Sequence, residues 1–472
     1  MVRIYNIIAR LCSYMTNPCI DESVFVRYSC ISASAKEKIR NEIRNSLGFL
    51  FVDKKKDSHK ENRDEGFLIR QLKEDDMDGS FFQALERYID FLEQQSYHFI
   101  IIGLLQVLDE GLKTLLLEKI RECQSDDFSV VLNTNRETTG IGILPRTSCV
   151  WERKHRLSHS YNRLDNFLFN MLMLENSILG ELIDKHYFLK NDVFPDFAVR
   201  KKIKIAVSPL RMERGFSVDD YEKDMVQYFK INYKSESFSE ENQAVWQKIL
   251  TASENKSDII VFPEMLGNPE MKDYISAKLN ALTEEEQMNM PSLIFLPSFW
   301  NNYQNTVAIL DNRGSVICSQ TKQNPFRLER PETCFLEGIK QNMVVNILHH
   351  EGIGRVAVLI CKDFITTKYM EQLMRCFKLT LIIVPSFSTG SYDFRQSFDL
   401  CAHDDCNVVW INTCAAFQRG KESNFKNIGY VRKRIGRNDD ESQKLCEMPI
   451  CEGAFEGRCT HDCIFFETIK GV

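Results

Sequence analysis

The stretch GRVAVLICKDF, residues 354–364, decides how the second half of the chain is interpreted. Its apolar run from Val356 to Ile360 is typical of a strand buried in a sheet, and the run ends at Cys361. Cysteine is among the most often buried residue types, so such a cysteine is by itself more often core than nucleophile. The residues that follow the other predicted strands decide between these two interpretations.

Two more apolar runs end at residues that carry chemistry. DIIVFPE at 258–264 ends at Glu264, and Lys322 follows VICSQT at 316–321. Open α/β sheets gather their working groups at strand ends, so Glu264, Lys322 and Cys361 could converge. Alone, the glutamate would be a loop residue and the lysine a solvated one. Together they form a general base, an ammonium for a developing oxyanion, and a nucleophile for a carbonyl or nitrile carbon.

The pattern of the chain changes near residue 200. Before it, apolar residues recur at three- and four-residue spacing, which predicts helices at 81–95, 104–123 and 163–189. After it, predicted strands alternate with helices and one hairpin, which indicates an α/β fold with mixed sheets. We therefore predict three parts. These are a mainly helical N-terminal domain of unknown role (1–200), an α/β domain (201–440) and a cysteine-rich tail (441–472).

Composition narrows the classes of function. The chain has 472 residues and a net charge of −6, which gives no general reason to expect a nucleic-acid partner. The longest apolar run, 98–108, is too short to span a bilayer, and no secretory leader is evident. Most of the sixteen cysteines are scattered singly, so we expect a reducing cytoplasm and no membrane contact.

The second half resembles the carbon–nitrogen hydrolase, or nitrilase, superfamily over about residues 201–418. Six segments carry the resemblance in the family's order and spacing. They are IIVFPEMLG, NTVAILDNRGSVICSQTK, ETCFLEG, GRVAVLICKDF, LIIVPSFS and CAHDDCNVVWINTC. The resemblance implies a nitrilase-like four-layer α-β-β-α sandwich. It also implies a homodimer or higher oligomer.

The resemblance also implies an activity. The family's Glu-Lys-Cys triad corresponds to Glu264, Lys322 and Cys361, and it hydrolyses non-peptide C–N bonds through a thioester. No cofactor is required for that chemistry. Amides are commoner substrates in the family than nitriles, so we expect an amidase-like enzyme acting on a small-molecule amide or nitrile.

Supporting residues follow from the same resemblance. The family's second glutamate, which positions the lysine, maps best to Glu332, with Glu329 and Glu337 as alternatives. The backbone N–H of Lys362 could join an oxyanion hole, because that role needs no particular side chain. We expect Asp363 to fix the turn after the cysteine.

The sequence departs from the family at several places. Lys362 follows the cysteine where the family often has an aromatic residue, and Glu332 is one residue out of register for the second glutamate. Residues around 211–240 look like an insertion, and Asp405 with Cys406 stands where the family has Glu-Asn. These departures leave the substrate open. The alternative is a nitrilase-fold assembly or regulatory module that works with a separate partner, for example in a bacterial defence system. Residues 1–200 would then be a candidate surface for a protein partner.

The tail concentrates metal-ligating residues. Cys446, Cys451, Cys459, Cys463 and His461 lie within eighteen residues, and four such groups could close a tetrahedral zinc site. The spacing contains no CxxC pair, so four free thiols are the alternative. A structural zinc is therefore one hypothesis for the tail.

Overall fold

The computed structural model describes residues 2–53, 67–124, 130–152, 163–194, 197–210, 215–233, 238–331, 333–417, 426–434, 445–451, 453 and 463–470. Two compact units divide the chain: Met1–Ser148 with Arg153–Gly180, and Cys149–Glu152 with Glu181–Val472. The division falls at Gly180 rather than near residue 200. The reason is that strand β5 (Ile183–Phe188) pairs with β16 (Val344–His350) of the second unit. Among the described residues, no helix combines the length and apolar composition needed to cross a membrane.

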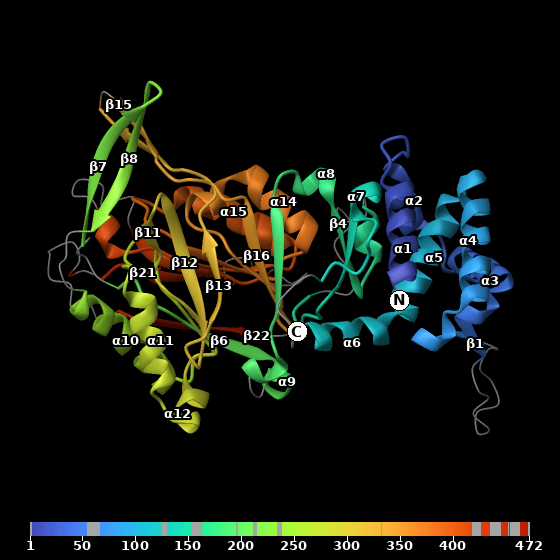
Figure 1. Cartoon of the computed structure of the whole chain (residues 1–472), viewed down its shortest axis with the longest axis horizontal. Helices are drawn as coiled ribbons and strands as arrows, with labels where there is room; N and C mark the ends of the chain where they lie inside the picture. Colours follow the sequence, from blue (N-terminus) through green and yellow to red (C-terminus); the bar gives the residue numbers. More distant parts are fainter. Residues whose placement is uncertain are drawn as a thin grey trace. The chain divides into compact units, whose positions relative to one another are not determined.

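Helices form much of the described part of the first unit (Figure 1). They are α1 (Val2–Met15), α2 (Ser23–Cys30), α3 (Ala33–Ser46), α4 (Gly79–Gln94), α5 (His98–Gly111), α6 (Lys113–Cys123), α7 (Arg136–Thr139) and α8 (Asn176–Leu179), with the 3₁₀ turns η1 (Gly48–Leu50), η2 (Glu74–Asp76) and η4 (Leu164–Phe167). Helix α5 is buried on nearly every face, as a helix that is apolar all round should be. The apolar run at 98–108 is thus the core helix of this unit.

Short strand pairs complete the first unit and correct one prediction. Strands β1 (Phe51–Asp53) and β2 (Phe67–Ile69) pair antiparallel, as do β3 (Ile141–Pro145) and β4 (Met171–Glu175). The helix predicted over 163–189 is wrong, because this stretch contains η4, β4, α8 and β5. Its run MLML at 171–174 is wholly buried, and a short apolar run fits a buried strand as well as a helix.

One seven-stranded sheet of the second unit carries the strand that leads to Glu264. Its strands are β6 (Lys202–Val207), β9 (Ile259–Val261), β10 (Leu293–Phe295), β11 (Phe299–Asn301), β12 (Gln304–Asp311), β13 (Val316–Thr321) and β22 (Phe465–Lys470). Strands β6, β9 and β10 run parallel, and β12 with β13 forms the predicted hairpin. Apolar side chains of this sheet form one core cluster with helices α10 (Ser239–Glu254) and α11 (Met271–Asn280). The short helix α12 (Glu284–Asn289) follows α11.

A second seven-stranded sheet carries the strand that leads to Cys361. Its strands are β5, β16, β17 (Gly354–Val358), β18 (Leu381–Pro385), β19 (Asn407–Ile411), β20 (Asn427–Arg432) and β21 (Leu445–Pro449). The helices between or beside them are α9 (Phe197–Arg200), α13 (Lys362–Ile365), α14 (Thr367–Phe377) and α15 (Tyr392–His403), with η5 (Asn191–Val193) and η6 (Cys414–Ala416). Strands β17, β18 and β19 run parallel and are buried along their whole length. Their near-continuous apolar sequences are therefore explained by burial on both faces.

Side chains of β13 join the two large sheets. Gln320 donates from Nε2 to the Val344 carbonyl at 3.1 Å and accepts from the Asn346 N–H at 3.0 Å. The Asn346 side chain in turn donates to the Ser319 carbonyl at 3.0 Å. Buried polar groups are normally hydrogen-bonded, and these amides satisfy each other across the sheets. The strand that leads to Lys322 is thereby held against the sheet that leads to Cys361.

A smaller, four-stranded sheet arises from the predicted insertion. Strands β7 (Phe216–Lys223) and β8 (Val226–Tyr233) form an antiparallel hairpin, and β8 pairs with β15 (Thr333–Glu337), which pairs with β14 (Arg327–Arg330). In Figure 1 the hairpin rises away from the two large sheets. The insertion at 211–240 is thus a structured element, although residues 211–214 and 234–237 lie outside the described part.

Arg355, the basic residue of GRVAVLICKDF, is fully buried. Its guanidinium contacts Glu152 at 3.1 Å and donates to the Lys378 carbonyl at 2.7 Å, while Trp151 donates to the Thr380 carbonyl at 3.2 Å. Gly354 beside it has φ +89°, and a Cβ there would lie 2.6 Å from the Thr380 hydroxyl. Residues 149–152 therefore complete the core of the second unit, although the 28 residues of Arg153–Gly180, which belong to the first unit, separate them from the rest of its sequence.

Replacing Glu152 should destabilise the second unit. We expect Glu152→Gln to lower the free energy of unfolding by about 3 kcal/mol, because it leaves the buried Arg355 guanidinium without its counter-charge. Urea unfolding followed by tryptophan fluorescence measures this, since Trp151, Trp246, Trp300 and Trp410 all belong to the second unit.

The control is Glu371→Gln, which removes an exposed ion pair with Arg375 on α14. It should change the same free energy by no more than about 0.5 kcal/mol. Equal unfolding midpoints for the two variants would contradict a structural role for the Glu152–Arg355 pair.

Candidate active site

Cys361 sits on a sharp turn between β17 and α13. Its φ of 47° and ψ of −99° lie outside the ordinary regions for a residue with a side chain. The turn is held by backbone hydrogen bonds, from the Cys361 N–H to the Pro385 carbonyl at 2.9 Å and from Phe364 to Cys361 at 3.1 Å. Strain of this kind persists only where the surroundings enforce it, and it is found at turns that present a nucleophile.

Lys322 follows β13 and is almost completely buried. Its Nζ contacts Glu264 Oε1 at 2.8 Å and Glu337 Oε2 at 2.7 Å. Burial acts to lower the pKa of Lys322, but the charges of Glu264 and Glu337 together hold it well above its usual range. The ammonium is therefore a fixed positive charge between two carboxylates.

Glu264 is oriented at both carboxylate oxygens. Its Oε1 accepts from Lys322 and from Asn305 Nδ2, each at 2.8 Å, and its Oε2 accepts from the Phe387 N–H at 2.8 Å. Its own backbone N–H donates to the Ser386 carbonyl at 3.3 Å. The side chain is thus tied to β12, to the residue after β13 and to the segment after β18.

The surroundings of Cys361 favour the neutral form of its thiol. Burial raises its pKa, the negative charge of Glu264 raises it further, and Lys322 opposes these effects only in part. Nucleophilic attack therefore requires a base to take the thiol proton. The carboxylate with the largest influence on the thiol is Glu264.

Glu337 is the second glutamate that contacts the lysine. We expected Glu332, with Glu329 and Glu337 as alternatives, and Glu332 lies outside the described residues. Glu329 is exposed and lies 3.6 Å from Arg327. Glu337 is buried, its Oε2 accepts from the Phe326 N–H at 2.8 Å, and burial raises its pKa.

Asp363 does more than the predicted turn requires. The turn is closed by the backbone, from the Asp363 N–H to the Ile360 carbonyl at 3.0 Å. The carboxylate instead accepts from the N–H groups of Gln323 and Asn324 at 3.1 and 2.7 Å, and from Asn324 Nδ2 at 2.8 Å. Burial raises its pKa to about 7. The side chain therefore connects the turn of Cys361 to the segment directly after Lys322.

Lys362 begins helix α13 directly after the cysteine. The first N–H groups of a helix have no acceptor within it, so the backbone N–H of Lys362 is available to a ligand beside Cys361. The Lys362 side chain is half-buried, and it has no role in the predicted oxyanion contact, which uses only the backbone N–H. The backbone position fits the predicted oxyanion contact, which stays a prediction.

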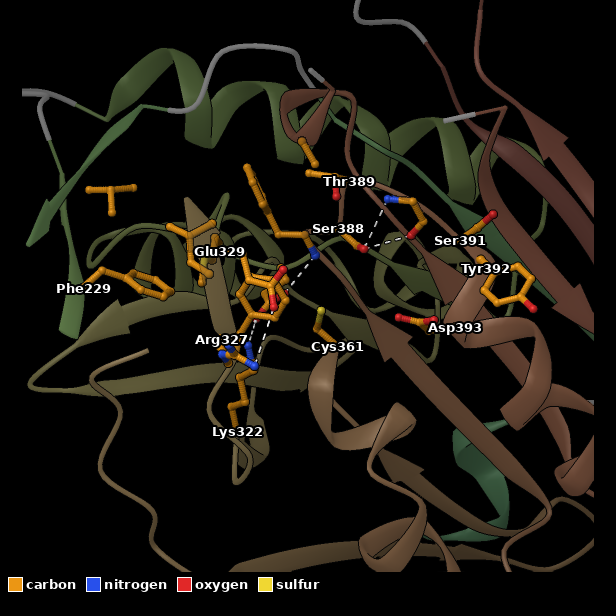
Figure 2. A pocket seen from close by; sticks show the side chains of 18 of the residues that line it. Phe229, Lys322, Arg327, Glu329, Cys361, Ser388, Thr389, Ser391, Tyr392 and Asp393 are labelled. Carbon is orange, nitrogen blue, oxygen red and sulfur yellow. Dashed lines mark hydrogen bonds and ion pairs between the residues drawn. The ribbon is translucent and has the colours of Figure 1, made fainter. Parts of the chain in front are cut away.

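A cavity of about 800 Å³ opens above these groups and is lined by Glu264, Lys322 and Cys361. Figure 2 shows Cys361 between two sides, with Phe229 and Glu329 on one and with Ser391 and Asp393 on the other. The first side comes from β7, β8 and β14, and the second from residues 388–395. A bound molecule could therefore reach the thiol from solvent while contacting both sides.

Several groups of the site were not identified from the sequence. Asn305 opens the hairpin motif NTVAILDNRG, so the motif itself was the signal for it. The contribution of Phe387 is a backbone N–H, which leaves no side-chain signal. The insertion contributes four apolar residues to the cavity: Phe216 and Val218 on β7, and Phe229 and Ile231 on β8. Their spacing of two residues along each strand was the signal that they share one face.

The cysteine-rich tail stays a separate question. Cys459 and His461 lie outside the described residues. Within the part that the structure describes, no three His, Cys, Asp or Glu side chains gather as a metal site requires. Cys446 lies beside Lys433 and Glu467, and burial raises the pKa of its thiol. The zinc site remains a prediction.

No family model and no curated protein matches the sequence. Among solved structures, similarity is found to the NitFhit protein of C. elegans, at 15% identity over 57% of this chain and 61% of that one, with a TM-score of 0.36. An amidase from Nesterenkonia sp. is similar at 13% identity, with 57% and 91% of the chains covered and a TM-score of 0.36.

A third similar structure is Saccharomyces cerevisiae Nit3, described as a member of branch 10 of the nitrilase superfamily. It is 14% identical over 57% of this chain and 90% of that one, with a TM-score of 0.35. The roles of individual residues are argued from the geometry of the site.

Alkylation of Cys361 should depend steeply on pH. Because its pKa is raised, we expect the rate of reaction with iodoacetamide to rise about tenfold per pH unit between about pH 7 and pH 9, without a plateau. Mass spectrometry of the Cys361 peptide measures the rate. The exposed Cys30 reports reagent activity in the same sample. A rate that is independent of pH over this range would indicate a preformed thiolate and contradict the proposed need for a base.

Proposed function

We propose that the second unit hydrolyses non-peptide carbon–nitrogen bonds, as an amidase or nitrilase does, through a thioester on Cys361. One observation carries this proposal. The thiol stands on a strained turn at the floor of a cavity, beside a buried ammonium that contacts Glu264 and Glu337. Burying three charged groups is costly, and such clusters facing a cavity are typical of functional sites.

The first half of the reaction follows from these contacts. Glu264 takes the proton of the Cys361 thiol, and the sulfur forms a bond to the carbonyl carbon of the amide. The carbonyl electron pair moves to oxygen, where the Lys322 ammonium and the Lys362 N–H stabilise the negative charge. The C–N bond then breaks, Glu264 returns the proton to the leaving nitrogen, and ammonia or an amine departs. The acyl group remains on sulfur as a thioester.

Water completes the cycle. Glu264 takes a proton from a water molecule, whose oxygen attacks the thioester carbon. The C–S bond breaks, the carboxylic acid leaves, and Cys361 recovers its proton. No cofactor takes part in this scheme. For a nitrile, the thiol would add across the C≡N bond to give a thioimidate. One water would then attack its carbon and ammonia would leave, which gives the same thioester, and a second water would hydrolyse that thioester as above.

Glu264 is a better candidate for the base than Glu337. Glu264 lines the cavity together with the thiol, whereas Glu337 is absent from the described lining. Glu264 also influences the pKa of the Cys361 thiol more strongly than Glu337 does, whereas Glu337 Oε2 contacts Lys322 and the Phe326 N–H. We assign Glu337 to holding the ammonium in place, and Asp363 to holding the segment that follows it.

We propose a four-layer α-β-β-α sandwich for the second unit. Its support is the pair of seven-stranded sheets joined through Gln320 and Asn346, with α10 and α11 in the core cluster of one sheet. On the other sheet, Phe394 of α15 lies 5.0 Å from Trp410 of β19 between ring centroids. An N-terminal mainly helical domain is proposed for the first unit.

The setting of the enzyme is also proposed. We place it in the cytoplasm, and support comes from the described cysteines, which form no disulfide with one another. A homodimer or higher oligomer, and a protein partner bound through residues 1–200, remain predictions that follow from the resemblance and from the extent of the first unit.

Substitution of Cys361 tests the activity. We expect Cys361→Ala to lower kcat/KM on a panel of simple amides and nitriles at least about 1,000-fold, because the covalent route is lost. Labelling by an electrophilic cysteine probe should disappear from the Cys361 peptide. The matched control is Cys30→Ala on α2 of the first unit, which should change neither readout.

Two results would contradict the enzyme hypothesis. They are turnover that survives Cys361→Ala, and absence of turnover on every substrate by a folded wild type. Either would favour the alternative of an assembly or regulatory module that works with a separate partner, for example in bacterial defence.

Metal analysis tests the tail. If Cys446, Cys451, Cys459, Cys463 and His461 supply a zinc site, purified protein should contain about one equivalent of zinc that survives dialysis. Substituting Cys459 by serine should remove it and leave the amide panel unchanged. Less than about half an equivalent in the wild type would contradict the site.

A further inference from the structure

We propose that the substrate carries an apolar chain or ring of about six or more carbons, which binds along the β7–β8 hairpin while its C–N bond meets Cys361. This inference rests on the proposed function and names the class of amide that the same site takes. It concerns the side of the cavity formed by the β7–β8 hairpin, which contributes no residue to the Glu264, Lys322 and Cys361 triad.

The size of the cavity favours a substantial molecule. Its volume of about 800 Å³ lies toward the upper end of the range for drug-sized ligands. A molecule as small as acetamide would leave most of this space filled with water. The remainder of the cavity can contribute to binding only if the substrate extends away from the reacting carbon.

The hairpin presents one chemical character to the cavity. Val218 lies directly across from Ile231 in the strand register, and Phe216 and Phe229 share their face and line the cavity. The opposite face alternates with these positions and carries polar residues, such as Asp219 opposite Lys230. The hairpin is therefore apolar where it lines the cavity, although the same face also carries Asp220, which stands opposite Phe229 and pairs with Arg330.

This apolar wall begins at the catalytic groups. The Phe387 N–H donates to Glu264, and the Phe387 ring lies 5.7 Å from that of Phe216 between centroids. Phe387 thus connects the carboxylate of the proposed base to the hairpin without a polar gap. A chain attached to the reacting carbon or to its nitrogen would pass directly onto apolar surface.

The opposite side has the other character. It is formed by Ser388, Thr389, Ser391 and Asp393, and Figure 2 shows the last two across Cys361 from Phe229. Two residues of this side already have partners, since Arg395 contacts Glu447 at 2.6 Å and the Ser388 N–H donates to Asn412. Hydrocarbon is therefore expected along the β7–β8 hairpin itself, and polar substituents beside Arg327 and Glu329 of β14 or on this opposite side.

The first test compares kcat/KM for amides of increasing chain length. We expect kcat/KM to rise from acetamide through propionamide and hexanamide to octanamide by up to about fourfold for each methylene that is buried, and by at least about 100-fold in total. A second series places the chain on nitrogen instead, with N-methylacetamide as its short member and N-octylacetamide as its long one. A gain in either series supports the proposal and shows on which side of the bond the chain binds.

Variants on the two faces of the hairpin locate the effect. Phe229→Ala should lower kcat/KM about tenfold for the long substrate and by less than about twofold for acetamide. Val218→Ser is a second variant at a half-buried position, should the larger change prevent folding. The control is Lys230→Ala on the opposite face, which should alter neither substrate.

The two hypotheses fail differently. If wild type hydrolyses acetamide and the long amides within about threefold of one another, or if Phe229→Ala and Val218→Ser reduce all substrates equally, the apolar-substrate inference is overturned and the proposed function stands. If no amide in any series is hydrolysed, the proposed function is overturned together with it.

Discussion

The contact of the Lys322 ammonium with Glu264 and Glu337 is the interaction on which the site depends. Removing charged groups from water costs several kcal/mol each, and only good geometry and further hydrogen bonds repay that cost. The structure supplies these from separate elements, because Asn305 and the Phe387 N–H bind Glu264 and the Phe326 N–H binds Glu337. The charged cluster can therefore form only when both large sheets and the small sheet are in place.

The same requirement explains what the sequence could predict. Glu264, Lys322 and Cys361 each end an apolar run, and a polar residue at the end of a buried strand is visible without the fold. The contact partner of the lysine could not be read that way. Glu337 is one of two glutamates in the short motif ETCFLEG, and only its burial on β15 and its contact with Lys322 show that its carboxylate reaches inward.

Long-range pairing also explains the error over residues 163–189. The stretch has apolar residues at helical spacing, but β4 finds its partner in β3 and β5 finds its partner in β16. His186 of β5 and His349 of β16 even share a hydrogen bond of 2.9 Å, a contact between residues far apart in the sequence. Local periodicity carries no information about such partners, so tertiary pairing decided the structure.

The position of the nucleophile relative to the ammonium depends on a side chain that takes no proton in the proposed reaction. Cys361 and Lys322 follow strands of different sheets, and sheets can shift against each other. Asp363, two residues after the cysteine, accepts hydrogen bonds from Gln323 and Asn324, directly after the lysine. The strained turn and the end of β13 are thereby fixed to each other within a few ångströms of the chemistry. The sequence GRVAVLICKDF thus encodes a strand, the cysteine that we propose as nucleophile and, in its aspartate, a group that ties the turn of this cysteine to the segment directly after Lys322.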